Sequence, residues 1–402
     1  MVQEDNVDKI SYWNIVWEQF SKGALPMIGL ISVFALILLA IFAPVISLDK
    51  PFYYSEGSRV DFPWFMALFD RNFFENGVDI FFNLQMFLLP PFLGLVFFVN
   101  RVLKKQFFDF FPKFLILYAL LSYGLFAMID FNPMQLPFQN WQSKVEEAKD
   151  SGLDVTVIWP LKEHAFRTPN TMGRHPSQPS NMYFMGTDKE GRDVFSRMIF
   201  GTRISLTIGL VAVGIYIILG VILGSCAGYF GGFVDLVISR FIEIMLCFPT
   251  FFLILTLSAL IQDRSIFHVM LIIGLTRWPE VARLVRAEFL KLKNMDYVQA
   301  AIALGFSKSR IIFGHILPNA LGPVIVTAVF GIASSILIES SLSFLGLGDV
   351  TAPSWGEILS QGRQEFKLWL ILCPGLAIFF VVSVFNLVGE GLQDAMDPKQ
   401  RR

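Results

Sequence analysis

The sequence predicts an all-α polytopic membrane protein, because of its composition and its long apolar runs. Apolar residues make up 54% of the 402 residues and charged residues only 16%, against about 25% charged in an average soluble domain. The 43 phenylalanines outnumber the 33 acidic residues. A soluble globule needs more polar surface than this composition supplies, and the chain is therefore expected to cross a lipid bilayer several times.

Eight segments are candidate membrane-spanning helices, since a span needs about 20 mostly apolar residues. Five runs approach or exceed that length: Leu25–Ile46, Ile80–Val99, Ile204–Gly224, Ala320–Leu337 and Leu368–Val388. Two candidates are shorter, Phe114–Ile129 and Ile244–Ile261. The eighth, Phe267–Val285, is only weakly apolar, because charged residues from Arg277 onward interrupt it.

Basic residues orient these spans, because Lys and Arg accumulate in cytoplasmic loops. The short loop Arg101–Lys105 is basic, which places the N-terminus inside and Asp130–Arg203 outside. The basic cluster from Arg283 to Arg310 is also expected inside, and parity then requires Phe267–Val285 to cross. The sequence thus predicts eight spans with the N-terminus and the C-terminus in the cytoplasm.

Two segments outside the spans have distinct compositions. Asp130–Phe184 is rich in proline and polar residues, and we expect an extracytoplasmic loop with one helix, Trp141–Lys149, and no hydrophobic core of its own. Its Trp141 and Trp159 suit either membrane-interface anchors or local packing. Near the start, Tyr12–Phe20 has an amphipathic pattern that suits a helix along the cytoplasmic face.

Several classes of function are disfavoured by what the sequence contains. A net charge of −1 provides no basic surface for nucleic acid. The three cysteines and four histidines are dispersed, so no metal site and no disulfide framework is expected. The sequence has no Gly-x-x-x-x-Gly-Lys-Ser/Thr phosphate loop, and we therefore expect no cofactor and no ATP hydrolysis by this chain itself.

The most informative cytoplasmic stretch is Asn294–Asn319. Asp296 is suited to cap a short helix, and Gly305 to the left-handed position that ends one. Ser307 is suited to cap a second helix, and Pro318 is expected to end it. Alanines leave the first helix with a small surface that another protein's backbone can approach closely. The alternative is an ordinary loop between two spans.

This stretch resembles the "EAA" loop of ATP-binding cassette importer permeases, whose pattern is E-A-A, three residues, G, nine residues, I, one residue, L-P. Matches at the right spacing are Ala300, Ala301, Gly305, Leu317 and Pro318, while Gln299 replaces the family's glutamate and His315 stands at the isoleucine position. The resemblance implies that this segment is the coupling loop, which docks into a groove of a separate ATPase subunit.

A second stretch, Met185–Leu206, is similar to a signature of the C-type permease in dipeptide, oligopeptide and nickel importers. We call it the outer motif, and its fixed positions are Gly186, Thr187, Asp188, Gly191, Arg192, Asp193, Ser196, Arg197 and Arg203. Thr187 and Glu190 have the spacing of a capping box. Asp193 and Arg197 are spaced to pair across one helical turn, and Arg203 is expected to anchor the outer end of the next span.

The resemblance implies three parts of the chain: residues 1–50 with an interfacial helix and the first span, an insertion at residues 51–184, and a permease core at residues 185–398. The fold it implies is a six-helix type I importer permease core plus an inserted transmembrane hairpin, with the coupling loop at residues 294–319. Two further motifs, Arg240–Glu243 and Val285–Leu290, look closest to the Yej-type oligopeptide branch. The hairpin is either a peripheral packing element or a docking surface for an accessory or binding protein.

The function that the resemblance implies is a permease subunit forming half of a translocation path for peptides in the cytoplasmic (inner) membrane. Its partners would be a second, B-type permease, ABC ATPase subunits and an extracytoplasmic substrate-binding protein. The alternative is an ion-coupled secondary transporter or channel, which needs ionisable groups at mid-membrane. The acids closest to the spans are Glu243, Glu280, Glu339 and Glu390, and each lies near a predicted span end. The residues suggest no hydrolase, and they do not reveal the transported molecule.

Overall fold

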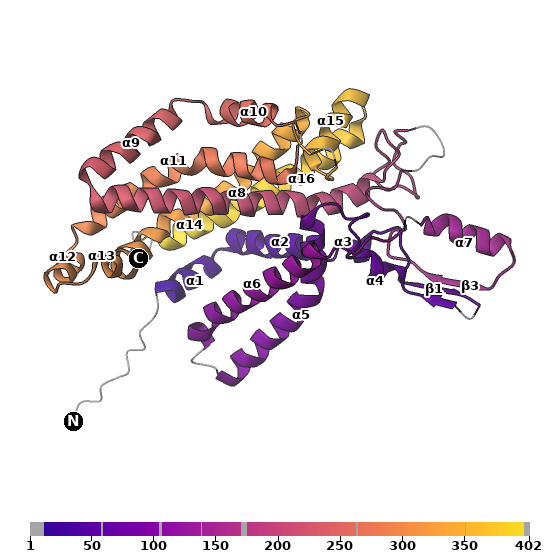
Figure 1. Ribbon diagram of the computed structural model, residues 1–402, viewed down its shortest axis with the longest axis horizontal. Helices are drawn as coiled ribbons and strands as arrows, with labels where there is room; N and C mark the ends of the chain where they lie inside the picture. Colours follow the sequence, from indigo (N-terminus) through magenta and orange to yellow (C-terminus); the bar gives the residue numbers. More distant parts are fainter. Residues whose placement is uncertain are drawn as a thin grey trace. The chain divides into compact units, whose positions relative to one another are not determined.

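The computed structural model describes residues 12–57, 59–103, 107–137, 139–169, 175–262, 264–349 and 351–397 (Figure 1). The described chain divides into two compact units. Unit 1 takes its residues from Met1–Ala35, Ser205–Ser360 and Pro374–Arg402. Unit 2 consists of Leu36–Ile204 and Gln361–Cys373.

Six helical runs in the described part of the chain are long and apolar enough to cross a membrane, and they confirm six of the predicted spans. They are α2 (Ala24–Ile41), Gly77–Arg101 of α5 (Gly77–Leu103), Lys113–Phe131 of α6 (Phe107–Phe131), α8 (Val194–Phe230), the run Lys308–Phe344 and α16 (Leu368–Met396). The chain is thus a helical, multi-pass membrane protein. The basic loop Arg101–Lys105, which oriented the spans, lies partly outside the described residues.

The predicted span Ile244–Ile261 differs from a straight helix. It falls across α9 (Gly232–Leu246) and α10 (Thr250–Leu260), which meet at an angle of 81°. Pro249 lies at this break, where it cannot donate the backbone hydrogen bond of a helix interior. Counted as one bent span, the pair raises the number of spans in the described residues to seven.

The weakly apolar segment Phe267–Val285 forms part of α11 (Ile266–Lys293), a continuous helix of 28 residues. Its charged residues keep it outside the set of apolar spans, so an eighth span and the inside location of both termini stay predictions. In unit 1, α11 packs against α9, α10 and α14 (Leu317–Phe344). The Arg286 guanidinium of α11 donates to both carboxylate oxygens of Asp235 on α9, at 2.5 and 2.7 Å.

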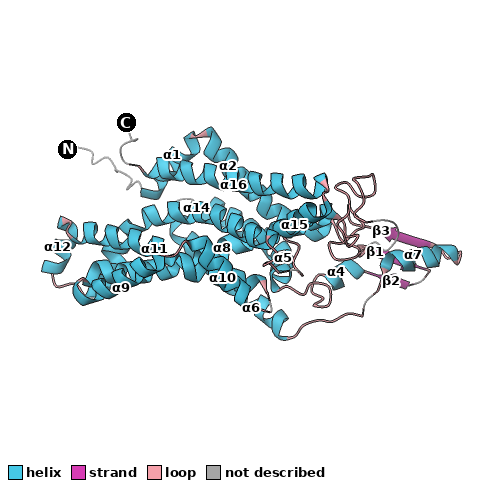
Figure 2. Cartoon of the chain, turned by 90° about the horizontal axis from the view of Figure 1, so that it is seen from above, coloured by secondary structure: helices cyan, strands magenta, loops and turns pink. Residues whose placement is uncertain are grey.

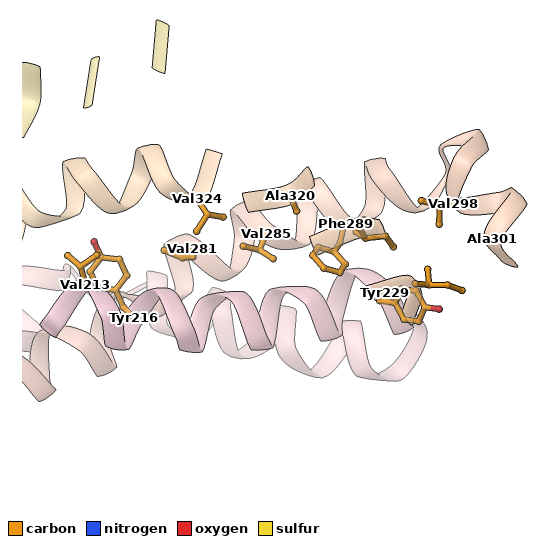
Figure 3. Packing of buried hydrophobic residues seen from close by; sticks show 12 residues of the cluster. Val213, Tyr216, Tyr229, Val281, Val285, Phe289, Val298, Ala301, Ala320 and Val324 are labelled. Carbon is orange, nitrogen blue, oxygen red and sulfur yellow. The ribbon is translucent and has the colours of Figure 1, made fainter. Parts of the chain in front are cut away.

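The core of unit 1 is built where α11 lies against α8 and α14. Val281, Val285 and Phe289 of α11 are buried in one apolar cluster with residues of α8 and α14 (Figure 3). Three glycines of α8 face this helix, and a Cβ on Gly224 would lie 2.5 Å from the carbonyl oxygen of Ala282. Gly220 and Gly228, one turn away on either side, are equally close to α11. Small residues at this spacing let two membrane helices approach at backbone distance.

The predicted amphipathic helix is α1 (Tyr12–Lys22), and its apolar face is covered by protein. Val16 and Phe20 are buried together with Ala395 at the end of α16. Trp17, on another side of α1, is 56% exposed. The helix is therefore confirmed, and one of its faces packs on the last span.

Unit 2 contains a small β-sheet, which corrects both the all-α prediction and the expected lack of a core in the loop. Its strand order is β2-β1-β3 and both pairings are antiparallel (Figure 2), formed by β2 (Arg59–Asp61), β1 (Tyr53–Glu56) and β3 (Val155–Ile158). The predicted helix is α7 (Trp141–Asp150), capped by the Asn140 side chain. Trp141 packs edge-on against the buried Tyr54 ring at 5.2 Å, so local packing is its role here.

The pairing of β1 with β3 explains why the sheet escaped prediction. Its partners are about 100 residues apart in the chain, with the hairpin between them, and each strand is only four residues long. A short strand stabilised by a distant partner leaves almost no periodic signal in the sequence.

The hairpin that the sequence analysis interprets as an insertion corresponds to α5 and α6, which lie side by side in unit 2 (Figure 1). Gln85 of α5 donates a hydrogen bond to the Ser122 hydroxyl of α6 at 2.5 Å, and both residues are buried. The Tyr118 hydroxyl of α6 donates to the other end of the same amide. At the base of the hairpin, Arg71 pairs with Asp130. The remaining short helices are α3 (Ala43–Ile46), α4 (Pro63–Ala67) and α15 (Trp355–Glu365).

Candidate functional site

The predicted coupling loop begins with α12 (Asp296–Ala303) and ends that helix in a tight turn. Gly305 has φ = 75°, the left-handed conformation that was predicted for it. The amide of Gly305 donates to the Ile302 carbonyl at 2.9 Å, and the amide of Phe306 donates to the Ala301 carbonyl at 3.1 Å. These two bonds form a Schellman motif, which satisfies carbonyl groups at the helix end. Its left-handed backbone conformation is strained for a residue that has a Cβ atom, and glycine at position 305 avoids that strain.

The start of α12 differs from the prediction. Met295 occupies the capping position, with no side-chain cap, and Asp296 is the first helical residue. Asp296 still places a negative charge in the first turn, where the helix dipole favours it. Aspartate is favourable both at the capping position and at the first helical position. The residue type alone therefore does not predict which of these two positions Asp296 occupies.

The second helix of the segment starts as predicted and continues further than predicted. The Ser307 hydroxyl accepts a hydrogen bond from the Arg310 amide at 3.4 Å and caps α13 (Lys308–Ile311). Pro318 does not end the helix. The chain passes through a π-helical turn, η1 (Ile312–Ile316), directly into α14, where Pro318 lies in the first turn and needs no hydrogen-bond donor.

Burial divides the coupling loop into an inner and an outer face. Val298 and Ala301 are buried in the core cluster of unit 1, as are Ile311 and Ile316. The exposed residues of this segment include Ala300, Ile302 and Leu304, and Leu304 is 73% exposed. An apolar surface of small and medium residues is thus presented outward on a short, well-anchored helix.

The remaining predicted residues of this loop lie on or beside that helix pair. The exposed Gln299 donates from its amide to the Lys293 carbonyl at 2.9 Å, a contact within its own chain. His315 stacks on Phe306 with ring centroids 5.8 Å apart. Leu317 is half-buried at the start of α14. The structure therefore brings all seven predicted residues of the coupling loop into one helix–turn–helix.

Asp188 is the centre of the outer motif. It is fully buried, and one carboxylate oxygen accepts from the amides of Glu190 and Arg192, both at 2.9 Å. The other oxygen accepts from the Arg192 guanidinium at 2.7 Å and from the Arg197 guanidinium at 3.0 Å. Arg197 is 1% exposed, so this is a buried ion pair held by several hydrogen bonds.

Asp193 caps the following helix. Its carboxylate accepts from the Ser196 amide at 3.0 Å and from the Ser196 hydroxyl at 2.5 Å, directly before α8. The predicted capping box of Thr187 and Glu190 is wrong, because both residues precede the helix by several positions. The Arg197 guanidinium donates to Asp188, nine residues earlier, a contact that was not predicted, and the i,i+4 pairing of Arg197 with Asp193 stays a prediction.

Two glycines and a threonine shape the turn before α8. Gly186 and Gly191 have φ of 71° and 81°. A Cβ on Gly186 would lie 2.5 Å from the Ser177 carbonyl oxygen, so the turn admits no larger residue there. The Thr187 hydroxyl accepts from the Ser177 amide at 2.8 Å and is fully buried. The backbone carbonyl of His164 accepts a hydrogen bond from the Ser196 hydroxyl at 3.1 Å. Burial of the His164 side chain lowers the pKa of its imidazole.

Arg203 lies on α8, nine residues after its first residue, and is fully buried, and its partners were not predicted. Its guanidinium donates to the Asp79 carboxylate at 3.0 Å and to the Asn83 side-chain oxygen at 2.8 Å. It also donates to the carbonyl of Ala40 at 2.7 Å. A signal was present in the sequence: Asp79 and Asn83 are polar residues four apart in a mostly apolar span, and such residues normally face a protein partner.

A second buried carboxylate lies in unit 1. Glu339 near the end of α14 is 3% exposed and accepts from the hydroxyls of Ser343 at 2.7 Å and Ser354 at 2.8 Å. The network joins the end of α14 to the chain just before α15.

The acidic side chains of the outer motif accept hydrogen bonds from groups of their own unit. In the described residues, no three His, Cys, Asp or Glu side chains lie together so as to hold a metal ion. Both carboxylate oxygens of Asp188 and one of Asp193 accept hydrogen bonds from guanidinium groups, amides or hydroxyls of their own unit.

Comparison with known families identifies the chain. Residues 216–402 match the family model described as "Binding-protein-dependent transport system inner membrane component", and residues 11–69 match "N-terminal TM domain of oligopeptide transport permease C". A dipeptide transport system permease protein DppC from Alkalihalophilus pseudofirmus is 42% identical over 250 residues, 61% of this chain and 82% of the relative. The chain belongs to the C-type permeases of ATP-binding cassette importers.

Other members of this family are about as similar to this chain as that DppC protein is. An oligopeptide transport system permease protein OppC from Haemophilus influenzae is 40% identical over 58% of this chain and 75% of its own length. The inner membrane ABC transporter permease protein YejE of Escherichia coli is also 40% identical, over 56% and 66%. These identities do not distinguish a branch, so the Yej-type assignment stays a prediction. Among solved structures, a chain of the MetNI methionine ABC transporter aligns with a TM-score of 0.42 and 15% identity, covering 50% of this chain and 97% of that chain.

Proposed function

We propose that this permease forms half of the translocation path of an ATP-driven importer for peptides, in the cytoplasmic (inner) membrane. The dipeptide, oligopeptide and glutathione transport systems named among its relatives support this class of substrate. A second, B-type permease would enclose the path, and an extracytoplasmic binding protein would deliver the ligand. ATP would be bound and hydrolysed by separate ATPase subunits, so this chain needs no cofactor.

The observation that carries the coupling role is the exposed face of α12. Val298 and Ala301 fix the helix to the core of unit 1, and the turn at Gly305 ends it. The opposite face, with Ala300 and Leu304, is free for an ATPase groove. Movement of the ATPase subunits would then displace α12 together with the core that its buried residues belong to.

The alternative of an ion-coupled transporter gains little support from the acids near the spans. Such a mechanism needs an ionisable group that exchanges its partner at mid-membrane. Glu339 is held by serine hydroxyls near the end of its helix. Glu243 is paired with Arg240 at 2.6 Å on α9, with a side chain that is 59% exposed.

The test is assembly and transport by the reconstituted complex. Leu304→Glu places a charge on the exposed face of α12, and we expect loss of the co-purified ATPase subunit and of ATP-dependent peptide uptake into proteoliposomes. Leu161→Glu is the matched control, because Leu161 is an equally exposed leucine in unit 2, at 81%. Retention of the ATPase by Leu304→Glu, or uptake by the permease without any ATPase, would refute the proposal.

A further inference from the structure

The membrane-spanning helix α8 contains an arginine that cannot reach water. Arg203 is 0% exposed, and it lies within the apolar run Val194–Phe230. A buried guanidinium without a counter-charge is strongly destabilising, because its lost hydration is not replaced. The residues that accept its hydrogen bonds therefore determine whether the folded arrangement around the N-terminal part of α8 is stable.

The counter-charge comes from the inserted hairpin. Asp79 and Asn83 occupy adjacent turns on one face of α5 and are 1% and 0% exposed. Asp79 accepts from Arg203 through its carboxylate at 3.0 Å and through its backbone carbonyl at 3.3 Å. The Asn83 amide is oriented, because its nitrogen donates to the Leu68 carbonyl at 2.7 Å while its oxygen accepts from Arg203.

The hairpin and the first turns of α8 share an apolar contact as well. The ring of Phe74, just before α5, lies 6.1 Å from the ring of Phe200 on α8. Phe166 lies against the same Phe200 ring at 4.4 Å. The Arg203 guanidinium stands over Phe200 at 4.9 Å from the ring centroid. The guanidinium also lies 5.5 Å from the centroid of the Phe82 ring of α5, so it contacts aromatic rings of both α8 and the hairpin at a site that is closed to water.

We propose that the hairpin α5–α6 is an integral part of the permease body, in which Asp79 and Asn83 are positioning residues that hold Arg203 and, through it, the N-terminal part of α8. This role is independent of the transported molecule and of the ATPase contact. It assigns a function to an insertion that otherwise suits only peripheral packing or docking.

The test is a double-mutant cycle in the assembled transporter. Asp79→Leu removes the carboxylate that balances the buried guanidinium charge, and we expect the ratio of assembled to aggregated permease to fall about a hundredfold. Arg203→Leu in the same chain removes the unpaired charge, and recovery to within about tenfold of wild type is expected. If the two single effects simply add, Asp79 is not the counter-charge and the proposal fails.

A milder substitution separates positioning from stability. Asp79→Asn keeps a hydrogen-bond acceptor without the charge, and we expect transport turnover per assembled complex to fall about tenfold with KM changed by less than about twofold. Asp79→Glu should restore most of the turnover. Asp130→Asn is the matched control: it is also an aspartate of the hairpin paired with an arginine, but its side chain is 46% exposed, and near-normal turnover is expected. Normal turnover of assembled Asp79→Asn, or equal effects of Asp79→Asn and Asp130→Asn, would overturn the proposal.

Discussion

The coupling loop and the outer motif are both short runs of fixed residues, yet they use those residues in opposite ways. In the outer motif, Asp188, Arg197 and Arg203 are buried and bonded to their own unit. In the coupling loop, Ala300 and Leu304 face outward on a helix whose other side is buried. The fixed residues thus lie inside the protein in one region and are partly exposed in the other, as expected if the coupling loop docks a partner as proposed.

Two glycines, one in each region, allow the contrast between buried and exposed motif residues to be measured. Gly186 and Gly305 have nearly the same φ, 71° and 75°. A Cβ at Gly186 would collide with the Ser177 carbonyl and the Trp369 ring, whereas a Cβ at Gly305 would meet open space. The same substitution therefore tests packing together with strain at one site and strain alone at the other.

The largest effect is expected for Arg197→Leu in the outer motif. Removing this guanidinium leaves the buried Asp188 carboxylate without one of its charged partners, at a cost of about 3–5 kcal/mol. Thermal unfolding of the purified complex should show severe destabilisation or no assembled permease. A variant that assembled and unfolded like wild type would show that the motif does not organise the interior.

Gly186→Ala should come next. The strained φ costs about 1–2 kcal/mol, and the clash with Ser177 adds a further cost of about 1–3 kcal/mol because backbone atoms must shift. The measurement is the yield and unfolding temperature of the assembled permease. If Gly186→Ala were no more harmful than Gly305→Ala, the tight packing around this turn would be contradicted.

Gly305→Ala should have a smaller effect on stability and a specific effect on coupling. The backbone strain of about 1–2 kcal/mol corresponds to a 5- to 30-fold lower population of the native turn. Substrate-stimulated ATPase activity should fall by a similar factor while the protein still assembles. Gly314→Ala is the matched control, since Gly314 lies in the same segment, also faces open space and has no positive φ. Equal activities of the two variants would refute the role of the turn.

The smallest effect is expected for Gln299→Glu, which restores the acid of the family pattern. Gln299 is exposed, so stability should change by less than about 0.5 kcal/mol. The hydrogen bond from its side-chain amide to the Lys293 carbonyl requires a donor and would be lost in the glutamate variant, at an exposed site. ATPase affinity measured by co-purification should stay within about threefold of wild type. A large change in either direction would show that this position carries a charge-dependent contact.

The sequence was most informative where the signal is local. The left-handed Gly305 and the Ser307 cap depend on a few neighbouring residues, and the structure confirms both. Long apolar runs were equally reliable, because the bilayer imposes their length. The family resemblance was confirmed by comparison, since it rested on several motifs in a fixed order.

The interior of the outer motif was not predictable in the same way. Arg197 pairs with Asp188 across a turn whose shape depends on two left-handed glycines, and Arg203 pairs with Asp79, 124 residues away. The bend at Pro249 and the continuation past Pro318 also depend on surroundings, because a proline ends a helix only where a hydrogen bond is required. Prediction failed where a residue's partner is distant in the chain.

The π-helical turn at Ile312–Ile316 changes the direction in which the side chains of the following helix point. A π turn accommodates one surplus residue, and each residue of an α-helix advances by about 100° around the axis. The faces of α13 and α14 are therefore offset by about one residue relative to an uninterrupted helix. Shortening the chain by one residue here would rotate everything after it, and the apolar side chains that now face α11 would turn toward a different neighbour.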